Sequence, residues 1–255
     1  MNRLSTVATA LLALSGCTSL AAQDRAPIHV LASNGVKGLI EELQPRAERT
    51  VGHPLAIQFS STASLKQRIA AGERFDAVIL TTEAIDELAK NGKIAPGTRR
   101  ELARCGIGLG IRAGAPKPDI GTVDAFKKTL LQAKSITYAR DGASSPYLVS
   151  MFERLGVSSA IRPKITLAQG STVATASVRD GQIELVLTLI SEIVPVRGIE
   201  LVGPLPSELQ SYVNFAAGVS SQAESKSAAN ALVEFLAQSS LAQAYRDKGL
   251  EPSPQ

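Results

Sequence analysis

The sequence predicts an α/β protein of two lobes, in which each lobe is a mostly parallel sheet flanked by helices and a ligand cleft lies between the lobes. Short apolar runs alternate with helical patterns along the chain, which is typical of parallel sheets covered by helices. Four strand-to-helix turns are rich in glycine or hydroxyl residues. A glycine- and proline-rich break at 113–118 marks the entry into the second lobe.

The composition of the 255 residues is that of an ordinary globular protein, with 44% hydrophobic and 20% charged residues. The formal net charge is +4, and no run of lysine and arginine is longer than two residues. This balance suits a small anionic ligand and gives no basic stripe for nucleic acid. Aromatic residues make up 4% of the chain and tryptophan is absent, so stacking platforms for bases are not expected.

The first two dozen residues have the pattern of an export signal. Arg3 supplies a positive start, and residues 7–14 form an apolar run that is too short to span a bilayer. No later stretch has about 18 consecutive apolar residues, so no membrane span is predicted. We therefore expect a periplasmic protein.

Two cleavage positions fit this signal. A signal peptide of residues 1–21 would end on the small-x-small pattern of residues 19–21. Residues 14–17 resemble the lipobox of bacterial lipoproteins, so that removal of 1–16 would leave a lipidated Cys17. The lipobox is favoured, because Cys17 lies at the right distance from the apolar run.

The first lobe is predicted to comprise residues 26–107 together with 218–255. Ile28–Ala32 forms a strand that ends in a Ser-Asn-Gly turn, and an amphipathic helix follows in which Pro45 should kink or end the regular part. Leu55–Phe59 alternates apolar and polar residues, as a half-buried strand does.

Residues 59–65 carry a run of hydroxyls directly onto the start of a helix that Gly72 ends. The first N–H groups of a helix have no intrahelical partner, and the helix dipole places partial positive charge there. Ser61 or Thr62 could simply cap this helix. Because similar turns recur along the chain, we favour an anion site.

Further along the first lobe, Phe75–Leu80 is a continuous apolar run typical of a buried parallel strand, and residues 81–83 open the next helix. Cys105–Arg112 is a strand with glycine at alternate positions. Its glycines lie within the strand, so they are not a dinucleotide fingerprint but fit a crossover where another segment approaches closely, or a hinge. We expect Cys105 to be a small buried residue.

The second lobe, predicted over 108–217, repeats this plan. Its strands are expected at 135–139, 165–167 and 183–189, and its helices begin near Thr122 or Asp124, at Pro146 and after a Gly-Ser-Thr turn at 170–172. We expect the chain to cross between the lobes near 105–114 and again near 211–220. Residues 213–219 should form the last strand, residues 228–236 and 241–245 two amphipathic helices, and residues 251–255 a frayed end.

The chain offers no obvious catalytic or metal-binding motif. Its histidines, His29 and His53, cannot form a His-x-x-x-His pair, and there is no Cys-x-x-Cys, P-loop or Gly-x-Ser-x-Gly sequence. We therefore expect no cofactor and no metal.

Several short motifs, in their order along the chain, resemble the molybdate-binding proteins of ABC importers, which belong to the type 2 periplasmic binding proteins. The resemblance covers residues 27–252. It is carried by the Ala32-Ser33 turn, Phe59-Ser60-Ser61-x-x-x-Leu65, Gly72-Glu-x-x-Asp76-Ala-Val-Ile79, and Gly181-x-Ile-Glu-x-Val186 followed by Ser191-Glu192.

In the resembled family, hydroxyls of two first-lobe turns and backbone N–H groups of two second-lobe turns hold a tetrahedral oxyanion. The resemblance implies hydroxyl donors at Ser33 and Ser61 or Ser60, with N–H donors near Ala143 or Ser144 and at Val173. Arg140 is the cationic side chain near a predicted ligand turn, and its guanidinium suits a carboxylate, the alternative being a solvated loop arginine. The candidate ligand-binding residues are Ser33, Asn34, Ser60, Ser61, Arg140, Ala143, Ser144 and Val173.

The chain departs from the resembled family at two positions. The family's molybdate binders carry a tyrosine hydroxyl at roughly Leu189, and Glu192 stands where aspartate is usual. An apolar side chain at this place would desolvate an oxyanion without donating to it. An organic carboxylate tolerates that flank better than molybdate does.

The resemblance thus implies an extracytoplasmic, monomeric solute-binding protein that delivers a molybdate-like oxyanion or an organic carboxylate to the membrane permease of an ABC importer. An alternative is an isomerase, since aconitate isomerases resemble the same group of binding proteins. Proton transfer would then need an acid and a base near the bound anion. The candidates are Asp141, Glu192 and Tyr147, whose structural alternatives are a helix cap, a helix surface and core packing, respectively.

Overall fold

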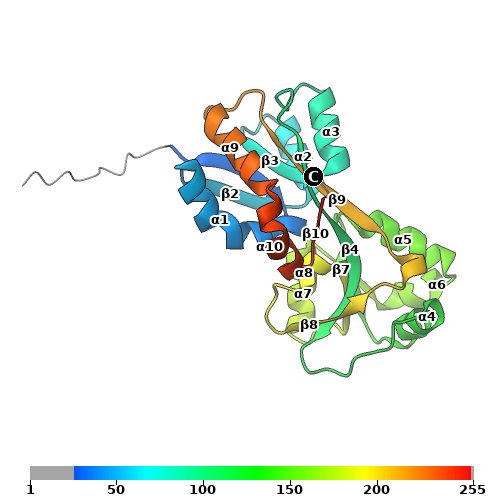
Figure 1. Cartoon of the computed structure of the whole chain (residues 1–255). Coiled ribbons are helices and arrows are strands. Elements are labelled where there is room, and N and C mark those ends of the chain that lie inside the picture. The colour runs from blue at the N-terminus through cyan, green and yellow to red at the C-terminus, as the bar shows by residue number, and fades with distance from the viewer. Residues whose placement is uncertain (1–25, 254–255) are drawn as a thin grey trace, which may run out of the picture.

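The computed structural model describes residues 26–253, which form two lobes (Figure 1). The expected signal peptide and Cys17 lie outside the described residues. The strands are β1 Ile28–Ser33, β2 Leu55–Ser60, β3 Ala77–Thr81, β4 Arg100–Arg112, β5 Ile136–Ala139, β6 Ile165–Ala168, β7 Leu185–Leu189, β8 Ile199–Pro204, β9 Tyr212–Val219 and β10 Glu251–Pro252. The α-helices are α1 Lys37–Val51, α2 Thr62–Ala70, α3 Thr82–Lys90, α4 Val123–Gln132, α5 Ser145–Arg154, α6 Ser158–Ile161, α7 Ser171–Arg179, α8 Ile190–Ile193, α9 Lys226–Leu236 and α10 Ala242–Asp247.

The strands form one sheet of ten, in the order β2-β1-β3-β9-β4-β7-β5-β6, with β8 and β10 both paired to β4. In the first lobe β1 runs parallel to β2 and β3, and in the second lobe β5 runs parallel to β6 and β7. The antiparallel members are β4, β8, β9 and β10. The two-lobed α/β architecture predicted from the sequence is thus the one observed.

Strand β4 belongs to both lobes. Its residues up to Gly106 pair with β9, and its residues from Ile107 onward pair with β7. Figure 1 shows β4 running from the upper lobe into the lower one. The alternate glycines of β4 make room for side chains of β8 and α8 that pack against it: a Cβ atom at Gly108 would lie 2.8 Å from Leu201 Cδ1 and 2.9 Å from Ile190 Cγ1. The close approach expected for this strand is therefore real.

Three expectations about individual elements need correction. Helix α1 does not end at Pro45 but continues to Val51, and Pro45 lies on the exposed face, where water can bind the carbonyl that proline leaves free. Strand β9 is not the last one, since Glu251 and Pro252 pair with Arg104 and Ala103 of β4 instead of fraying.

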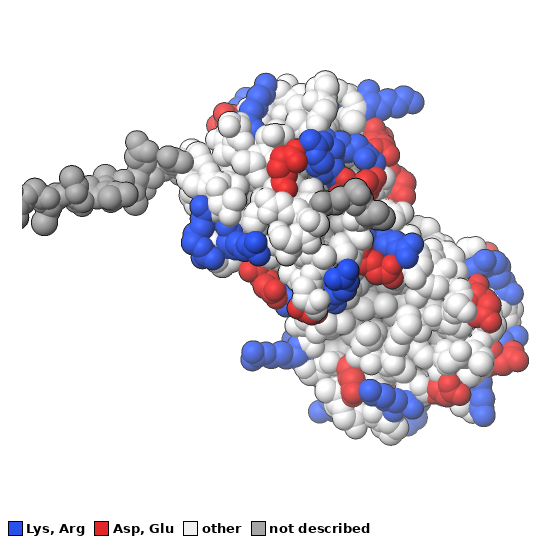
Figure 2. Space-filling model, in the orientation of Figure 1, with Lys and Arg blue, Asp and Glu red and all other residues white. Residues whose placement is uncertain are grey.

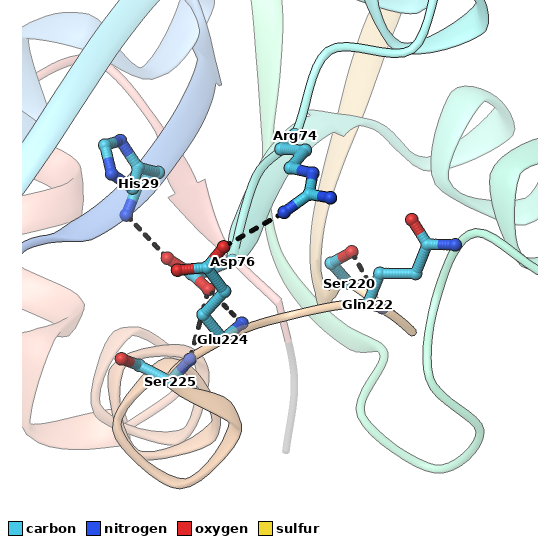
Figure 3. Close-up of polar contacts among 7 residues, drawn as sticks. All are labelled: His29, Arg74, Asp76, Ser220, Gln222, Glu224 and Ser225. Atoms are coloured by element: carbon cyan, nitrogen blue, oxygen red, sulfur yellow. Dashed lines mark hydrogen bonds and ion pairs between the residues drawn. The ribbon is translucent and has the colours of Figure 1, made fainter.

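Buried Asp76, which immediately precedes β3, joins three segments of the first lobe (Figure 3). Its Oδ2 accepts a hydrogen bond from the His29 backbone N–H at 2.9 Å. Its Oδ1 accepts from the backbone N–H groups of Glu224 at 2.8 Å and Ser225 at 3.3 Å, just before α9. Arg74 and Glu224 add an exposed ion pair at 3.2 Å. The aspartate of the Gly72–Ile79 motif therefore has a structural role.

Charges of both signs are interspersed over the surface seen in Figure 2. Across the described residues several charged side chains form ion pairs, including Arg104 with Glu251 at 2.6 Å and Arg99 with Asp86 at 2.5 Å. No single-sign stripe of the kind that binds nucleic acid lies on this face. None of the described helices is both long and apolar enough to cross a membrane.

Candidate functional site

The two hydroxyl-bearing turns of the first lobe lie side by side. Strands β1 and β2 are parallel, and their register places Ser33 opposite Ser60 at their carboxyl ends. Ser33 and Ser61 are buried, with 3% and 7% of their surfaces exposed. Ligands of parallel sheets bind at this edge of the strands.

The two buried serines cap the turns that follow them. Ser33 Oγ accepts a hydrogen bond from the Gly35 N–H at 3.3 Å. Ser61 is the N-cap of α2, and its Oγ accepts from the Ser64 N–H at 3.1 Å. The capping role considered for Ser61 is therefore present, but Ser61 has a second contact.

The second contact of Ser61 crosses between the lobes. Its hydroxyl donates to Asp141 Oδ2 at 2.5 Å, although the two residues are 80 positions apart in the sequence. Asp141 lies in the turn between β5 and α5 of the second lobe. The bond therefore joins one predicted anion-binding turn to a candidate acid–base residue.

A cavity of about 500 Å³ lies between the lobes beside this bond, and both lobes contribute to its walls. The first lobe supplies Thr62, Lys66 and Glu83, and the second lobe supplies the turn from Arg140 to Ser144. Lys66 forms an ion pair with Glu87. Within the described chain, the Arg140 guanidinium has no hydrogen bond or ion pair, which leaves it free for an anionic ligand.

Two hydroxyl groups in the wall of this cavity differ in their availability. Thr62 Oγ1 is buried and has no hydrogen-bond partner within residues 26–253. Tyr147, by contrast, donates its hydroxyl to the Leu209 carbonyl at 2.6 Å and accepts from Arg154 Nη2 at 2.9 Å. A buried unpaired hydroxyl gains stability when a ligand supplies a partner. Thr62 is thus the better placed of the two to bind one.

A second cavity, of about 170 Å³, contains Glu192 together with Asn34, Ser171 and Thr172. Thr188 donates its hydroxyl to Glu192, and Ser171 also forms a hydrogen bond with this carboxylate. Burial raises the pKa of Glu192 above the ordinary glutamate value, and the nearby charge of Asp141 raises it further. Glu192 is therefore held toward its protonated form, close to a second carboxylate.

The structure distributes the predicted site residues over the two cavities. The 500 Å³ cavity is bordered by the candidates of the β5–α5 turn and by Tyr147, while the 170 Å³ cavity is bordered by Asn34 and Glu192. Ser33, Ser60 and Ser61 border neither of these cavities. Val173 also borders neither, and its side chain is 52% exposed on α7.

Several residues of these cavities were missed in the sequence. Lys66 and Glu83 are ordinary polar residues of surface helices, so nothing in their local pattern marks them. Thr188 could have been noticed, because it is the one polar residue of the apolar strand β7. A buried hydroxyl at such a place needs a partner, and here the partner is Glu192.

Leu189 forms an apolar wall beside the first hydroxyl turn. It is buried, and a Cβ atom at Gly35 would lie 3.0 Å from its Cδ1.

Cys105, also buried, donates to the Gly249 carbonyl at 3.3 Å, and burial raises the pKa of its thiol to about 11. A thiol with so high a pKa is a poor nucleophile. No group of three or more potential metal ligands occurs among the described residues.

Comparison with known proteins gives a consistent picture of this chain. The family model described as "Bacterial extracellular solute-binding protein" matches residues 28–251. An aconitate isomerase from Pseudomonas sp. is 34% identical over 258 residues, which cover 99% of this chain and 98% of that protein.

Solved structures support the fold. The periplasmic molybdate-binding protein of Azotobacter vinelandii superposes with a TM-score of 0.72 at 16% identity, covering 89% of this chain and 100% of that one. The sulfate-binding protein SubI from Mycobacterium tuberculosis H37Rv gives a TM-score of 0.67 at 17% identity, covering 89% and 87%. At these identities the likeness concerns the fold alone.

Proposed function

The chain belongs to the bacterial extracellular solute-binding protein family, and from that premise we propose that it is an isomerase of aconitate or a closely similar tricarboxylate. The observation that carries this proposal is the similarity to aconitate isomerase over the full length of both chains. Transport, which was the first expectation from the sequence, becomes the second candidate.

The reaction requires a proton to move between two carbon atoms. Aconitate carries three carboxylates on a three-carbon chain with one double bond. Removal of a proton from the methylene carbon and its return to the former vinyl carbon shifts the double bond by one position. This shift interconverts the cis and trans forms without any oxidant. A base, an acid and groups that stabilise the delocalised negative charge are sufficient.

The cavity of about 500 Å³ is our proposed substrate site. Its volume lies in the range of small-molecule sites and exceeds what a single tetrahedral oxyanion fills. The unpaired guanidinium of Arg140 can bind one substrate carboxylate through two parallel hydrogen bonds. The free hydroxyl of Thr62 can donate to another. These groups would hold the substrate's carbon chain beside Asp141.

Asp141 is our proposed base and Glu192 our proposed acid. Asp141 borders the cavity and is held by Ser61, which orients its carboxylate. Glu192 borders the smaller cavity, and its raised pKa lets it keep a proton that an ordinary glutamate would lose. As the acid, it would have to reach the substrate when the two lobes close on it. Two nearby carboxylates in unlike surroundings are a common arrangement for acid–base work. Tyr147 is less suited, because its hydroxyl hydrogen is already donated to Leu209.

The proposal is tested with purified mature protein and both isomers of aconitate. We expect interconversion of the isomers, followed by NMR, and exchange of a carbon-bound proton with solvent deuterium. Asp141→Asn should lower kcat by about 10²–10⁴-fold, the usual contribution of a general base. Arg140→Ala should chiefly raise KM. Absence of both interconversion and exchange in the wild-type protein would contradict the proposal.

The second candidate is the binding protein of an ABC importer for a di- or tricarboxylate. The family assignment and the fold shared with molybdate- and sulfate-binding proteins support it. It predicts tight one-to-one binding in calorimetry, with the ligand recovered unchanged. The permease partner, the monomeric state, the periplasmic location and the lipid at Cys17 stay predictions of the sequence.

A further inference from the structure

The hydroxyl of Ser61 is already used within the protein. A serine hydroxyl has one hydrogen to donate, and in Ser61 this hydrogen goes to Asp141 Oδ2 at 2.5 Å. The same oxygen accepts from the Ser64 N–H at 3.1 Å. A hydrogen bond between a hydroxyl and a carboxylate is short and strong, so an incoming anion has to displace Asp141 before it can be bound by Ser61.

The charges near this bond disfavour a compact divalent anion. Asp141 is itself negative and stands where an anion bound by Ser61 would lie. Glu83 and Glu87 border the adjoining cavity, and Lys66, which borders the same cavity, forms an ion pair with Glu87. Arg140 is adjacent to Asp141 in the turn after β5 and is unpaired within the described chain, so it is available to a carboxylate placed in the cavity. The negative charge of a compact oxyanion is localised, so such an ion bound at Ser61 would be repelled by the Asp141 carboxylate.

We propose that Asp141 determines the ligand specificity of the cleft: its carboxylate occupies the oxyanion position at Ser61, which excludes tetrahedral oxyanions and directs extended polycarboxylates into the adjoining cavity. An extended ligand can place its carboxylates at Arg140 and Thr62 and present carbon to Asp141. The apolar side chain of Leu189, packed against Gly35, reinforces the exclusion, since it donates nothing to an oxyanion. This inference concerns selection among anions and goes beyond the proposed isomerase function.

The inference predicts that removing the Asp141 carboxylate creates a binding site for a tetrahedral oxyanion. Molybdate and sulfate are titrated by calorimetry into the wild-type protein and the Asp141→Ala, Asp141→Asn and Glu83→Gln variants. We expect no saturable binding by the wild-type protein at concentrations up to about 1 mM. Asp141→Ala should bind at least one of the two oxyanions at least about tenfold more tightly, because it frees the Ser61 hydroxyl and removes a charge. The oxyanion affinity of Asp141→Asn should lie between those of the wild-type protein and Asp141→Ala.

Two controls separate the Ser61 contact from general electrostatics. Glu83→Gln removes a negative charge from the same cavity without touching Ser61, so it should change oxyanion affinity by less than about threefold. Adding Ser61→Ala to Asp141→Ala should abolish the gain. Micromolar oxyanion binding by the wild-type protein, no gain in Asp141→Ala, or a gain that survives the loss of Ser61 would each overturn the inference. None of these readouts uses isomerase activity, so failure of the proposed function is recognised separately by the aconitate assay.

Discussion

Glu192 shows how one residue can link stability to pH. Its pKa is raised mainly by burial, so the native state favours the protonated form more than the unfolded chain does. The stabilisation associated with that proton is fully present below the ordinary glutamate pKa and is lost as the pH rises through the raised value. Glu192→Gln removes this dependence, because glutamine stays neutral. We expect the variant to gain stability over the wild type as the pH rises from about 4 to 8.

Thermal unfolding of both proteins across that pH range measures the effect. Glu153→Gln, an exposed change on α5, is the control and should follow the wild type throughout. A stability difference between Glu192→Gln and the wild type that does not change with pH would show that Glu192 is ionised alike in the folded and unfolded chains.

Asp76 carries a second prediction at the scale of the residue. Three backbone N–H groups depend on its carboxylate, and the residue is buried. Asp76→Ala leaves these donors unpaired and should lower the free energy of unfolding by about 2–5 kcal/mol. Denaturant titration measures this loss. Glu224→Gln removes only an exposed ion pair and should cost less than about 0.5 kcal/mol, so equal losses in both variants would refute the argument.

Local pattern was sufficient to predict some of these residues and not others. The sequence marked Ser61 as a cap or an anion donor, because a hydroxyl between a strand and a helix has few other uses. The bond from Ser61 to Asp141 could not be predicted, since it joins turns 80 residues apart that meet only when the two lobes come together. The role of Asp76 was equally hidden, because its partners are backbone groups from distant segments.

Among the elements, β4 gives the clearest prediction. A Cβ atom at Gly108 would lie 2.8 Å from Leu201 Cδ1 and 3.2 Å from the Gly203 carbonyl oxygen. Gly108→Ala should therefore destabilise the protein by about 1–3 kcal/mol, as overpacking of a core does. Gly121→Ala, at a site with ordinary space around it, is the matched control and should have little effect. Equal midpoints of thermal unfolding for the two variants would contradict this.

The strand-to-helix alternation was predictable because buried parallel strands are continuous apolar runs and the helices between them are amphipathic. Strand β8 escaped notice, since Ile199–Pro204 contains a glutamate, a glycine and a proline and is only partly buried. The two-residue strand β10 was also missed, because its pairing with β4 depends on the position in space of the segment that follows the last helix, α10. Both missed strands pair with β4, and neither has the apolar run or the alternation of apolar and polar residues from which a strand is predicted.

At the scale of the whole molecule, α8 of the second lobe packs against the first lobe. Ser191, in α8, donates its hydroxyl to the Gly35 carbonyl at 2.7 Å. Glycines of the first lobe allow the approach: a Cβ atom at Gly38 would lie 2.6 Å from Pro195 Cγ, and one at Gly249 would lie 2.6 Å from Ile190 Cγ2. The contact between the lobes is therefore dense around α8.

This contact predicts separate effects on stability and on lobe closure. Gly38→Ala favours helix α1 itself by roughly 0.5–1 kcal/mol, since glycine is a poor helix former. The same methyl group would hold Pro195 and its lobe away. We expect an unfolding temperature that changes little, because the gain in α1 offsets the packing lost at Pro195, together with a larger radius of gyration in X-ray scattering and weaker binding of aconitate.

Arg49→Ala, an exposed change near the other end of α1, should leave the radius of gyration and the affinity as they are. If Gly38→Ala behaves in the same way, the packing of α8 against the first lobe does not control how far the lobes approach each other.

The shared strand β4 also limits how this scaffold can be recombined. Because its first half pairs with β9 and its second half with β7, the two lobes are not interchangeable modules joined by linkers. A chimera that takes its second lobe from a relative would need a junction inside β4, between Gly106 and Ile107, and a donor that keeps glycine at 108 and 110. New ligand specificities are thus more readily obtained by exchanging single turns, such as the one that bears Asp141, than by exchanging whole lobes.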